Sequence, residues 1–184
     1  MTTDAVTLWF ALLAIVAQLA AVSILVLHLT GRRPVLAEHV GPNALWLAFA
    51  VALVATLGSL YLSEVAHFPP CKLCWYQRIA MYPLVVVLGV AAARRDLGAR
   101  LAAGILAVLG GATSIYHLLV ERYPSLSSSS SCDPANPCSI RWVERFGYLT
   151  IPGMALSGFA LIVVLLAVAG AGRPAGERTD LAAS

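Results

Sequence analysis

Charged residues are scarce in this sequence. Asp, Glu, Lys and Arg make up 11% of its 184 residues, whereas hydrophobic residues make up 60%. An ordinary soluble domain carries about 25% charged residues, and a soluble chain of this composition would expose apolar side chains over most of its surface. Disordered chains are poor in apolar residues, so that class is excluded as well. The composition therefore predicts a membrane protein.

Clusters of basic residues are also missing. The formal net charge is +3, but Lys and Arg are scattered in ones and twos without interleaved aromatic residues. Proteins that bind nucleic acid carry basic patches or stripes. We therefore expect no nucleic acid partner and expect membrane lipid to surround the chain.

Five apolar stretches are long enough to cross a bilayer as helices, which takes about 20 predominantly apolar residues. They are Val6–Thr30, Pro42–Ala66, Trp75–Ala93, Leu101–Val120 and Thr150–Gly170. The first lacks the basic segment of a signal peptide and exceeds its usual apolar run of roughly 7–15 residues. We expect this span to be retained, and we predict an all-α, polytopic membrane helical bundle.

Basic residues near the span ends indicate the orientation, because cytoplasmic loops carry an excess of Lys and Arg. Such residues are Arg32 and Arg33 after the first span, Arg94, Arg95 and Arg100 between the third and fourth, and Arg173 and Arg178 after the fifth. We expect these regions to be cytoplasmic. The N-terminus and the connections 67–74 and 121–149 should then face outward. The predicted parts are residues 1–41 (first span and cytoplasmic loop), 42–172 (main bundle) and 173–184 (cytoplasmic tail).

The outer connection 121–149 ends in a segment with apolar residues at roughly helical spacing. They are Ile140, Trp142, Val143, Phe146 and Leu149. This pattern predicts a short amphipathic helix in the membrane–water interface. An irregular loop with aromatic residues near the headgroups is the alternative.

The chain has only four cysteines, and the predicted topology places all of them outside. Cys71 and Cys74 precede the third span, and Cys132 and Cys138 lie in the connection 121–149. Disulfides persist outside the cytosol, so the two local groups suggest two disulfide pairs. Four cysteines allow three connectivities, and this alternative stays open.

The first pair has the spacing Cys-x-x-Cys. So short a loop stabilises a fold little, and its usual use is redox exchange or metal binding. Cys74 lies at the start of the third span, where the helix macrodipole favours the reactive thiolate. Arg78 follows on the same helical face, although an arginine at mid-span costs about 2.5–3.5 kcal/mol. It could extend to the headgroups instead, but beside Gln77 and the cysteines we expect a functional site.

The second pair, Cys132 and Cys138, encloses a short loop with two prolines. It follows the run Ser127–Ser131, which we interpret as a flexible tether. A disulfide on such a tether could reach a visiting protein. The alternative is a disulfide that only shapes the loop.

The stretch Cys71-Lys-Leu-Cys74-Trp-Tyr-Gln-Arg78, continued by Ile-Ala-Met-Tyr-Pro, resembles the signature of the DsbB/BdbC family of membrane disulfide-forming proteins. The Cys-x5-Cys spacing of the second pair is more similar to the BdbC branch. The resemblance covers about residues 43–170. It implies a DsbB-like four-helix core, to which the first span adds one extra N-terminal helix.

The resemblance also implies an activity. The protein would reoxidise a thioredoxin-like partner of DsbA/BdbD type outside the bacterial cytoplasm and pass the electrons to a membrane quinone, ubiquinone or menaquinone. Cys71 and Cys74 would be the quinone-proximal pair, and Cys132 and Cys138 the partner-facing pair. Arg78 would help to bind and polarise the quinone.

Among the remaining polar residues near the outer side, we group Gln77 and His67 with Arg78 as candidate quinone-binding residues, and we expect no metal. His117 and Glu64, near the outer ends of spans, receive no assigned role.

Other functions are consistent with four cysteines. An oxidase similar to vitamin K epoxide reductase would have a similar bundle, but the Trp-Tyr-Gln-Arg run favours the DsbB/BdbC family. A membrane metal-binding protein could use the cysteines as ligands, since zinc sites use Cys-x2–4-Cys pairs. The wider second spacing and the oxidising side argue against it. A membrane scaffold with two structural disulfides is the remaining alternative.

Overall fold

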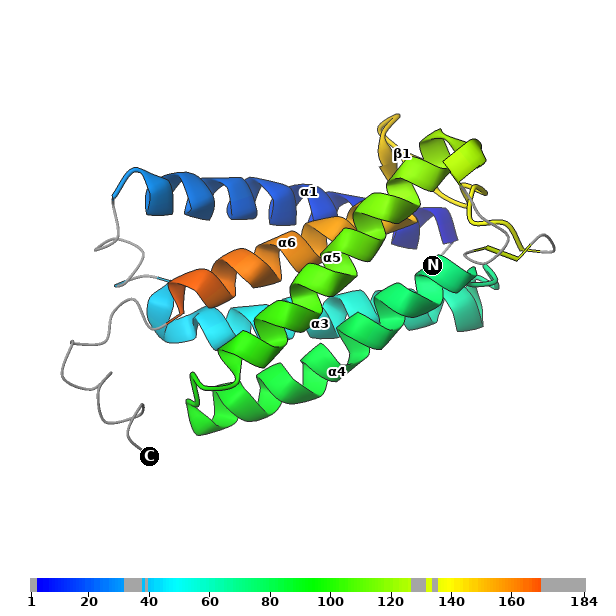
Figure 1. Ribbon diagram of the computed structural model, residues 1–184. Helices are drawn as coiled ribbons and strands as arrows, with labels where there is room; N and C mark the ends of the chain where they lie inside the picture. Colours follow the sequence, from blue (N-terminus) through cyan, green and yellow to red (C-terminus); the bar gives the residue numbers. More distant parts are fainter. Residues whose placement is uncertain (1–2, 32–37, 39, 127–131, 134–135, 170–184) are drawn as a thin grey trace.

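The structure is a computed structural model that describes residues 3–31, 38, 40–126, 132–133 and 136–169. Within these residues, five helices are long and apolar enough to cross a membrane. They are α1 (Thr3–Leu29), α3 (Ala44–Leu60) with its flanking short helices η1 (Gly41–Asn43) and η2 (Tyr61–Val65), α4 (Lys72–Arg94), α5 (Arg100–Arg122) and α6 (Ile151–Val168) (Figure 1). The predicted all-α bundle with five candidate spans is confirmed.

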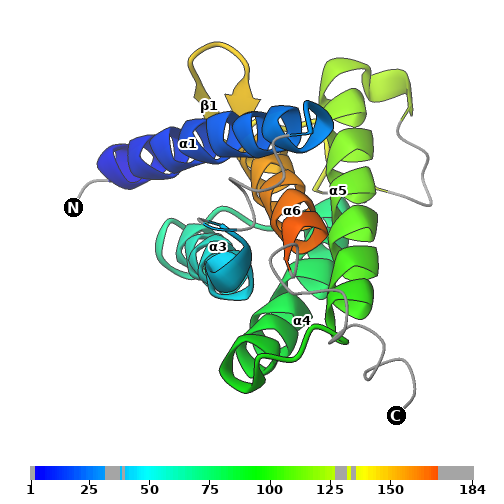
Figure 2. The same cartoon turned by 90° about the vertical axis from the view of Figure 1, so that its left-hand side faces the viewer.

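Helix α6 lies at the centre of the bundle. Figure 2 shows it between α1, α3 and α5, and it packs against all three. Helix α4 closes the bundle by packing against α3 and α5, while α1 lies along α6 on the side away from α4. Small residues allow close approach: a Cβ added at Gly110 of α5 would overlap the Phe159 ring of α6.

The segment before α6 forms a hairpin, so the predicted amphipathic helix at residues 140–149 is wrong. Strand β1 (Glu144–Arg145) pairs antiparallel with β2 (Leu149–Thr150). Phe146 and Gly147 both have positive φ, 55° and 73°, so the chain turns tightly in the left-handed region between the two strands. The Tyr148 N–H closes this turn by donating to the Arg145 carbonyl at 3.3 Å. Glycine adopts this conformation without steric cost, and the turn interrupts any helix.

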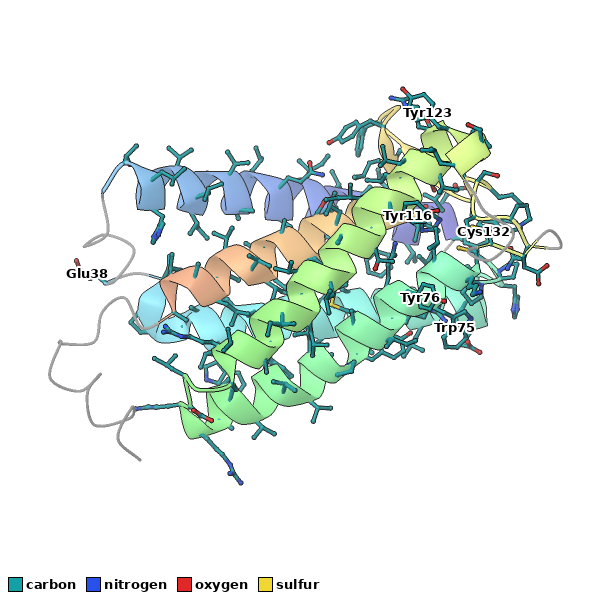
Figure 3. All side chains as sticks on the ribbon, viewed as in Figure 1. Glu38, Trp75, Tyr76, Tyr116, Tyr123 and Cys132 are labelled. Atoms are coloured by element: carbon teal, nitrogen blue, oxygen red, sulfur yellow. A yellow bond between two sulfur atoms is a disulfide. The ribbon has the colours of Figure 1, made fainter. Side chains whose placement is uncertain are left out.

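Both cysteine pairs lie at one end of the bundle. Figure 3 labels Cys132, Tyr116, Trp75 and Tyr76 at this end and Glu38 at the opposite end. Helix α4 begins beside Cys71 and ends at Arg94, so Arg94, Arg95 and Arg100 lie at the end away from the cysteines. Which end faces the cytoplasm stays a prediction. The serine run Ser127–Ser131 and the tail 173–184 lie outside the described residues.

Candidate redox centre

The four sulfur atoms gather in one buried cluster. Cys132 and Cys138 form a disulfide with a Cα–Cα distance of 5.8 Å. Cys71 and Cys74 are thiols, and their Sγ atoms lie 3.0 Å apart. Leu73 and Val120 pack around both pairs. Of the two disulfides that the grouping suggested, the structure contains Cys132–Cys138, whereas Cys71 and Cys74 lie side by side as thiols. The two groups are adjacent in space.

The start of α4 positions the Cys-x-x-Cys pair. Pro69 and Pro70 precede it, and Cys71 is the N-cap with extended backbone (φ −71°, ψ 173°). The Cys74 N–H donates to Cys71 Sγ at 3.4 Å, so this sulfur takes the place of a capping oxygen. The amide of Asn136 donates to the Pro70 carbonyl at 3.2 Å. This contact attaches the loop of the second pair to the first.

The contacts favour a thiolate on Cys71, whereas the sequence analysis placed it on Cys74. The pKa of the Cys71 thiol is lowered to about 4, chiefly because the Cys74 thiol donates a hydrogen bond to it. Burial opposes this effect, and the contact with His117 lowers the pKa further. Cys71 receives these hydrogen bonds because it is the N-cap, while Cys74 already belongs to the first turn of α4.

His117 joins the two pairs. Its side chain is buried on α5, with Nε2 3.7 Å from Cys71 Sγ and 3.0 Å from the Cys138 carbonyl oxygen. Nδ1 lies 3.2 Å from Nε2 of Gln77. When the Gln77 amide donates to Nδ1, the ring proton is on Nε2, facing the sulfur and the carbonyl. The sequence analysis left His117 without a role, and its place near the outer end of a span was the only available signal.

Arg78 is buried within the bundle and does not extend to the headgroups. Its Nε donates to Ser59 Oγ at 2.9 Å and its Nη2 to the Ser59 carbonyl at 2.8 Å. The guanidinium also lies 5.3 Å from the centre of the Trp75 ring, a cation–π distance. These contacts offset part of the cost of burying the charge. Among the described residues, none accepts a hydrogen bond from Nη1.

An apolar cavity of about 380 Å³ adjoins this centre, and α1, α3, α4 and α6 form its walls. Cys74, Gln77 and Arg78 line it, together with Ser59, but Cys71 does not. Most other lining residues are apolar. The size and composition are typical of a small-molecule site with a few polar groups. The inner pair, Cys71 and Cys74, thus has one residue in the cavity wall, while the other packs with the outer disulfide, Cys132–Cys138.

His67 lies apart from Gln77 and Arg78. It is exposed in the segment between η2 and α4, with a positive φ of 55°, and it is outside the cavity lining. Its nearness in sequence to Cys71 does not bring it to the site. Glu64 is exposed too, and it accepts a hydrogen bond from Ser63 Oγ at 3.0 Å.

The inner pair and His117 together provide three ligand atoms that are close enough to bind one metal ion. The Sγ atoms of Cys71 and Cys74 and a ring nitrogen of His117 lie within 4.8 Å of one another. The four-cysteine site considered as an alternative is not formed, because two of the sulfurs are joined as a disulfide.

Comparisons with known proteins identify the family of this chain. Residues 42–169 match the family described as "Disulfide bond formation protein DsbB". "Disulfide bond formation protein C" of Bacillus subtilis (strain 168) is 43% identical over 122 residues, which are 66% of this chain and 88% of that protein. "Probable disulfide formation protein" of Coxiella burnetii (strain CbuK_Q154) is 44% identical over 128 residues, 68% of this chain and 86% of that protein. No solved structure matches the chain. The chain therefore belongs to the DsbB family of disulfide bond formation proteins.

Proposed function

We propose that this protein is a membrane thiol–disulfide oxidoreductase that supports disulfide formation in exported proteins. It reoxidises a thioredoxin-like partner of DsbA/BdbD type and passes two electrons through Cys132/Cys138 and Cys71/Cys74 to a membrane quinone, ubiquinone or menaquinone. One observation carries the proposal: the inner pair lies between the outer disulfide and an apolar cavity that Cys74 lines and Cys71 does not.

The partner attacks the outer pair at Cys132. Cys132 is 7% exposed and Cys138 only 1%, so Cys132 offers the better access. A partner thiolate forms a bond to Cys132 Sγ, the Cys132–Cys138 bond breaks, and the electron pair leaves on Cys138. The second partner thiol then displaces Cys132, which releases the oxidised partner and leaves both outer cysteines as thiols.

Internal exchange carries the electrons inward. The Cys138 thiolate attacks Cys71 in an oxidised inner pair, Cys74 leaves as thiolate, and Cys132 then displaces Cys71 to restore the outer disulfide. The His117 contacts support this step, because Nε2 lies near both Cys71 Sγ and the Cys138 carbonyl oxygen. The product, an outer disulfide beside an inner dithiol, has the pairing described above.

The cavity residues suit a quinone. Arg78 offers Nη1 toward a carbonyl oxygen and stabilises negative charge there, an effect that is larger in a site without water than in solution. Cys74 and Gln77 line the same cavity as Arg78. A quinone bound there would supply an acceptor for two electrons and two protons. A partner as oxidising as DsbA, with a reduction potential of about −120 mV, can be reoxidised only by an acceptor that is more oxidising still.

Anaerobic turnover of the purified full chain in detergent tests the proposal, with a reduced thioredoxin-like substrate and a soluble quinone. We expect quinone-dependent thiol oxidation that is lost in Cys74→Ser and in Cys132→Ser. Cys74→Ser should still form a mixed disulfide with the partner, because Cys132 is intact. Wild-type turnover by Cys132→Ser would reject the electron path.

The function requires the cysteine end to face outward, with the N-terminus outside and the C-terminus in the cytoplasm. The arginines at the turn between α4 and α5 support this orientation through the excess of basic residues in cytoplasmic loops. A reporter that is active only outside the cytoplasm should be inactive when inserted at Leu97–Gly98. Activity there would reverse the orientation.

Metal binding is the second candidate, because Cys71, Cys74 and His117 lie close enough to share one ion. Catalytic zinc sites use three protein ligands. Zinc content and free thiols measured on the same purified, reduced protein distinguish the two functions. One bound zinc per chain with no quinone-dependent turnover would favour the metal site.

A further inference from the structure

Helix α1 lies outside the family-matched residues 42–169, yet it supplies one wall of the cavity. Its lining residues are Phe10, Leu13, Ala14, Val16 and Ala17. They come from the outer half of the helix, the half that begins beside the hairpin. The cavity beside the redox centre is therefore built partly by a segment that the family core does not include.

The cavity extends beyond the polar residues Cys74, Gln77 and Arg78 that line one end of it. Its lining on the α3 side runs from Leu62, near the cysteine end, to Ala50. At 1.5 Å per residue this is about 18 Å along the helix axis. Cys74, Gln77 and Arg78 lie at the cysteine end, and apart from Tyr82 the deeper lining is apolar. A flat polar headgroup would occupy the first part and leave the second for an apolar chain.

Polar contacts hold α1 in this position. Arg145 of the hairpin donates to Asp4 Oδ1 and to Thr7 Oγ1, each at 2.7 Å. Deeper in the bundle, Gln18 Nε2 donates to Ser157 Oγ of α6 at 2.9 Å. Hydrogen bonds between helices in a membrane restrict their relative rotation. These hydrogen bonds therefore fix the rotation of α1 about its axis and keep its lining residues turned toward the cavity.

The cavity opens sideways between α1 and α3. Near the cysteine end the two helices meet, since a Cβ at Gly58 would lie 2.9 Å from the Phe10 ring. Deeper down, Val16 of α1 and Val54 of α3 both line the cavity and are both exposed. At these two side chains the cavity is open to the surroundings of the bundle, which are lipid when the helices span a membrane. An apolar chain can therefore pass between α1 and α3 from the bilayer.

We propose that α1 forms the wall of a channel for the isoprenoid chain of the quinone, and that its lining residues determine which chain fits. This inference rests on the proposed function, because it takes the headgroup to bind at Cys74 and Arg78. The occupant is the polyprenyl chain, since the deep part of the cavity is apolar, opens to the lipid and continues directly from the redox centre.

A pair of matched variants tests this role. Val16 and Val22 lie on the same helix and are 61% and 60% exposed, but only Val16 lines the cavity. We would measure quinone reduction by Val16→Trp and Val22→Trp with two probes, a long-chain prenyl quinone and a chainless quinone with the same ring. Equilibrium binding of each quinone to the same variants, without a thiol substrate, is the second readout and should weaken in the same pattern. One misplaced group in an apolar pocket changes specificity by about tenfold or more.

We expect Val16→Trp to raise KM for the long-chain quinone about tenfold and to leave KM for the chainless quinone unchanged. Val22→Trp should match the wild type with both probes. Leu13→Trp, with Leu19→Trp as its control, is a second pair of the same design, and thermal unfolding checks that each variant is folded. Leu19 is exposed and lies outside the cavity lining.

The outcomes separate the two proposals. If the wild type reduces neither quinone, the proposed function fails and the channel fails with it. If the wild type reduces both quinones and the cavity variants match their controls, the channel is rejected while the proposed function stands. Equal losses with the long-chain and chainless probes would also reject the channel, because the tryptophan would then act on the headgroup end.

Discussion

Replacement of His117 by phenylalanine should make Cys71 a weaker acid. The His117 ring nitrogen lies 3.7 Å from Cys71 Sγ, and the contact lowers the pKa of this thiol. A hydrogen bond to a charged group contributes about 1.5–3 kcal/mol, and a tenfold change in acidity corresponds to about 1.4 kcal/mol. We therefore expect His117→Phe to raise the titration midpoint of Cys71 by about one to two pH units.

Thiolate absorbance in the ultraviolet measures this midpoint. The reduced protein would carry Cys132→Ser and Cys138→Ser, so that only the inner pair titrates. With His117 present, absorbance should persist until the pH falls to about 4, the lowered pKa of Cys71. In His117→Phe the thiolate absorbance should be lost at a higher pH, because only the hydrogen bond from Cys74 then remains to stabilise the Cys71 thiolate.

The same shift predicts how stability depends on pH. The pKa of Cys71 is depressed in the folded protein, from 9.0 to about 4. The thiolate therefore stabilises the reduced fold fully above pH 9.0, and this contribution declines with falling pH and is lost below about 4. In His117→Phe the pH below which this contribution is lost should be higher. Unfolding of the reduced protein by denaturant at several pH values measures the change.

His67→Phe is the matched control, because His67 is an exposed histidine at the same end of the bundle. Its midpoint should equal that of the intact protein. His117→Gln keeps an amide donor and should fall between His117→Phe and the intact protein. An unchanged midpoint in His117→Phe, or an equal rise in His67→Phe, would refute the role assigned to His117.

Two further substitutions test the site and the packing. Arg78→Gln removes the guanidinium from the cavity, so the rate of quinone reduction should fall by about 10²–10³, as for loss of one donor to a developing negative charge. Arg94→Gln, exposed at the far end of α4, is the control and should match the wild type. An unchanged rate in Arg78→Gln would contradict the role assigned to Arg78. Gly110→Val places a side chain against the Phe159 ring, which should lower the free energy of unfolding by about 1–3 kcal/mol in thermal or denaturant unfolding. Gly104→Val is the control, because nothing lies within 4 Å of a Cβ added there. Equal stability of the two variants would contradict the packing at Gly110.

The helical spans were predictable because the bilayer imposes a simple rule. A spanning segment must satisfy its own backbone hydrogen bonds, so a long apolar run in such a chain forms a helix. The hairpin before α6 was not predictable in the same way. Its apolar residues have helical spacing, but the positive φ of Phe146 and Gly147 forms a tight turn that a hydrophobic pattern does not encode.

In the candidate site, too, features that are local in sequence were predictable and contacts between distant residues were not. The Cys-x-x-Cys pair and Arg78 are local features of one helix start, and residues one turn apart on a helix share a face. His67 and His117 show where local reasoning fails. His67 is close to Cys71 in sequence but exposed, whereas His117 is 46 positions from Cys71 and contacts its sulfur.

The sequence by itself determined a helical membrane protein with two local groups of cysteines and an arginine within a span, one turn after the first group. Only the tertiary structure decided that Cys71 faces the outer disulfide while Cys74 faces the cavity, that His117 joins the two pairs, and that α1 closes a cavity beside the family core. The reason is physical. Spans and motifs depend on local composition and spacing, whereas these contacts depend on how helices distant in sequence rotate and pack against one another, and small residues such as Gly58 and Gly110 permit that packing.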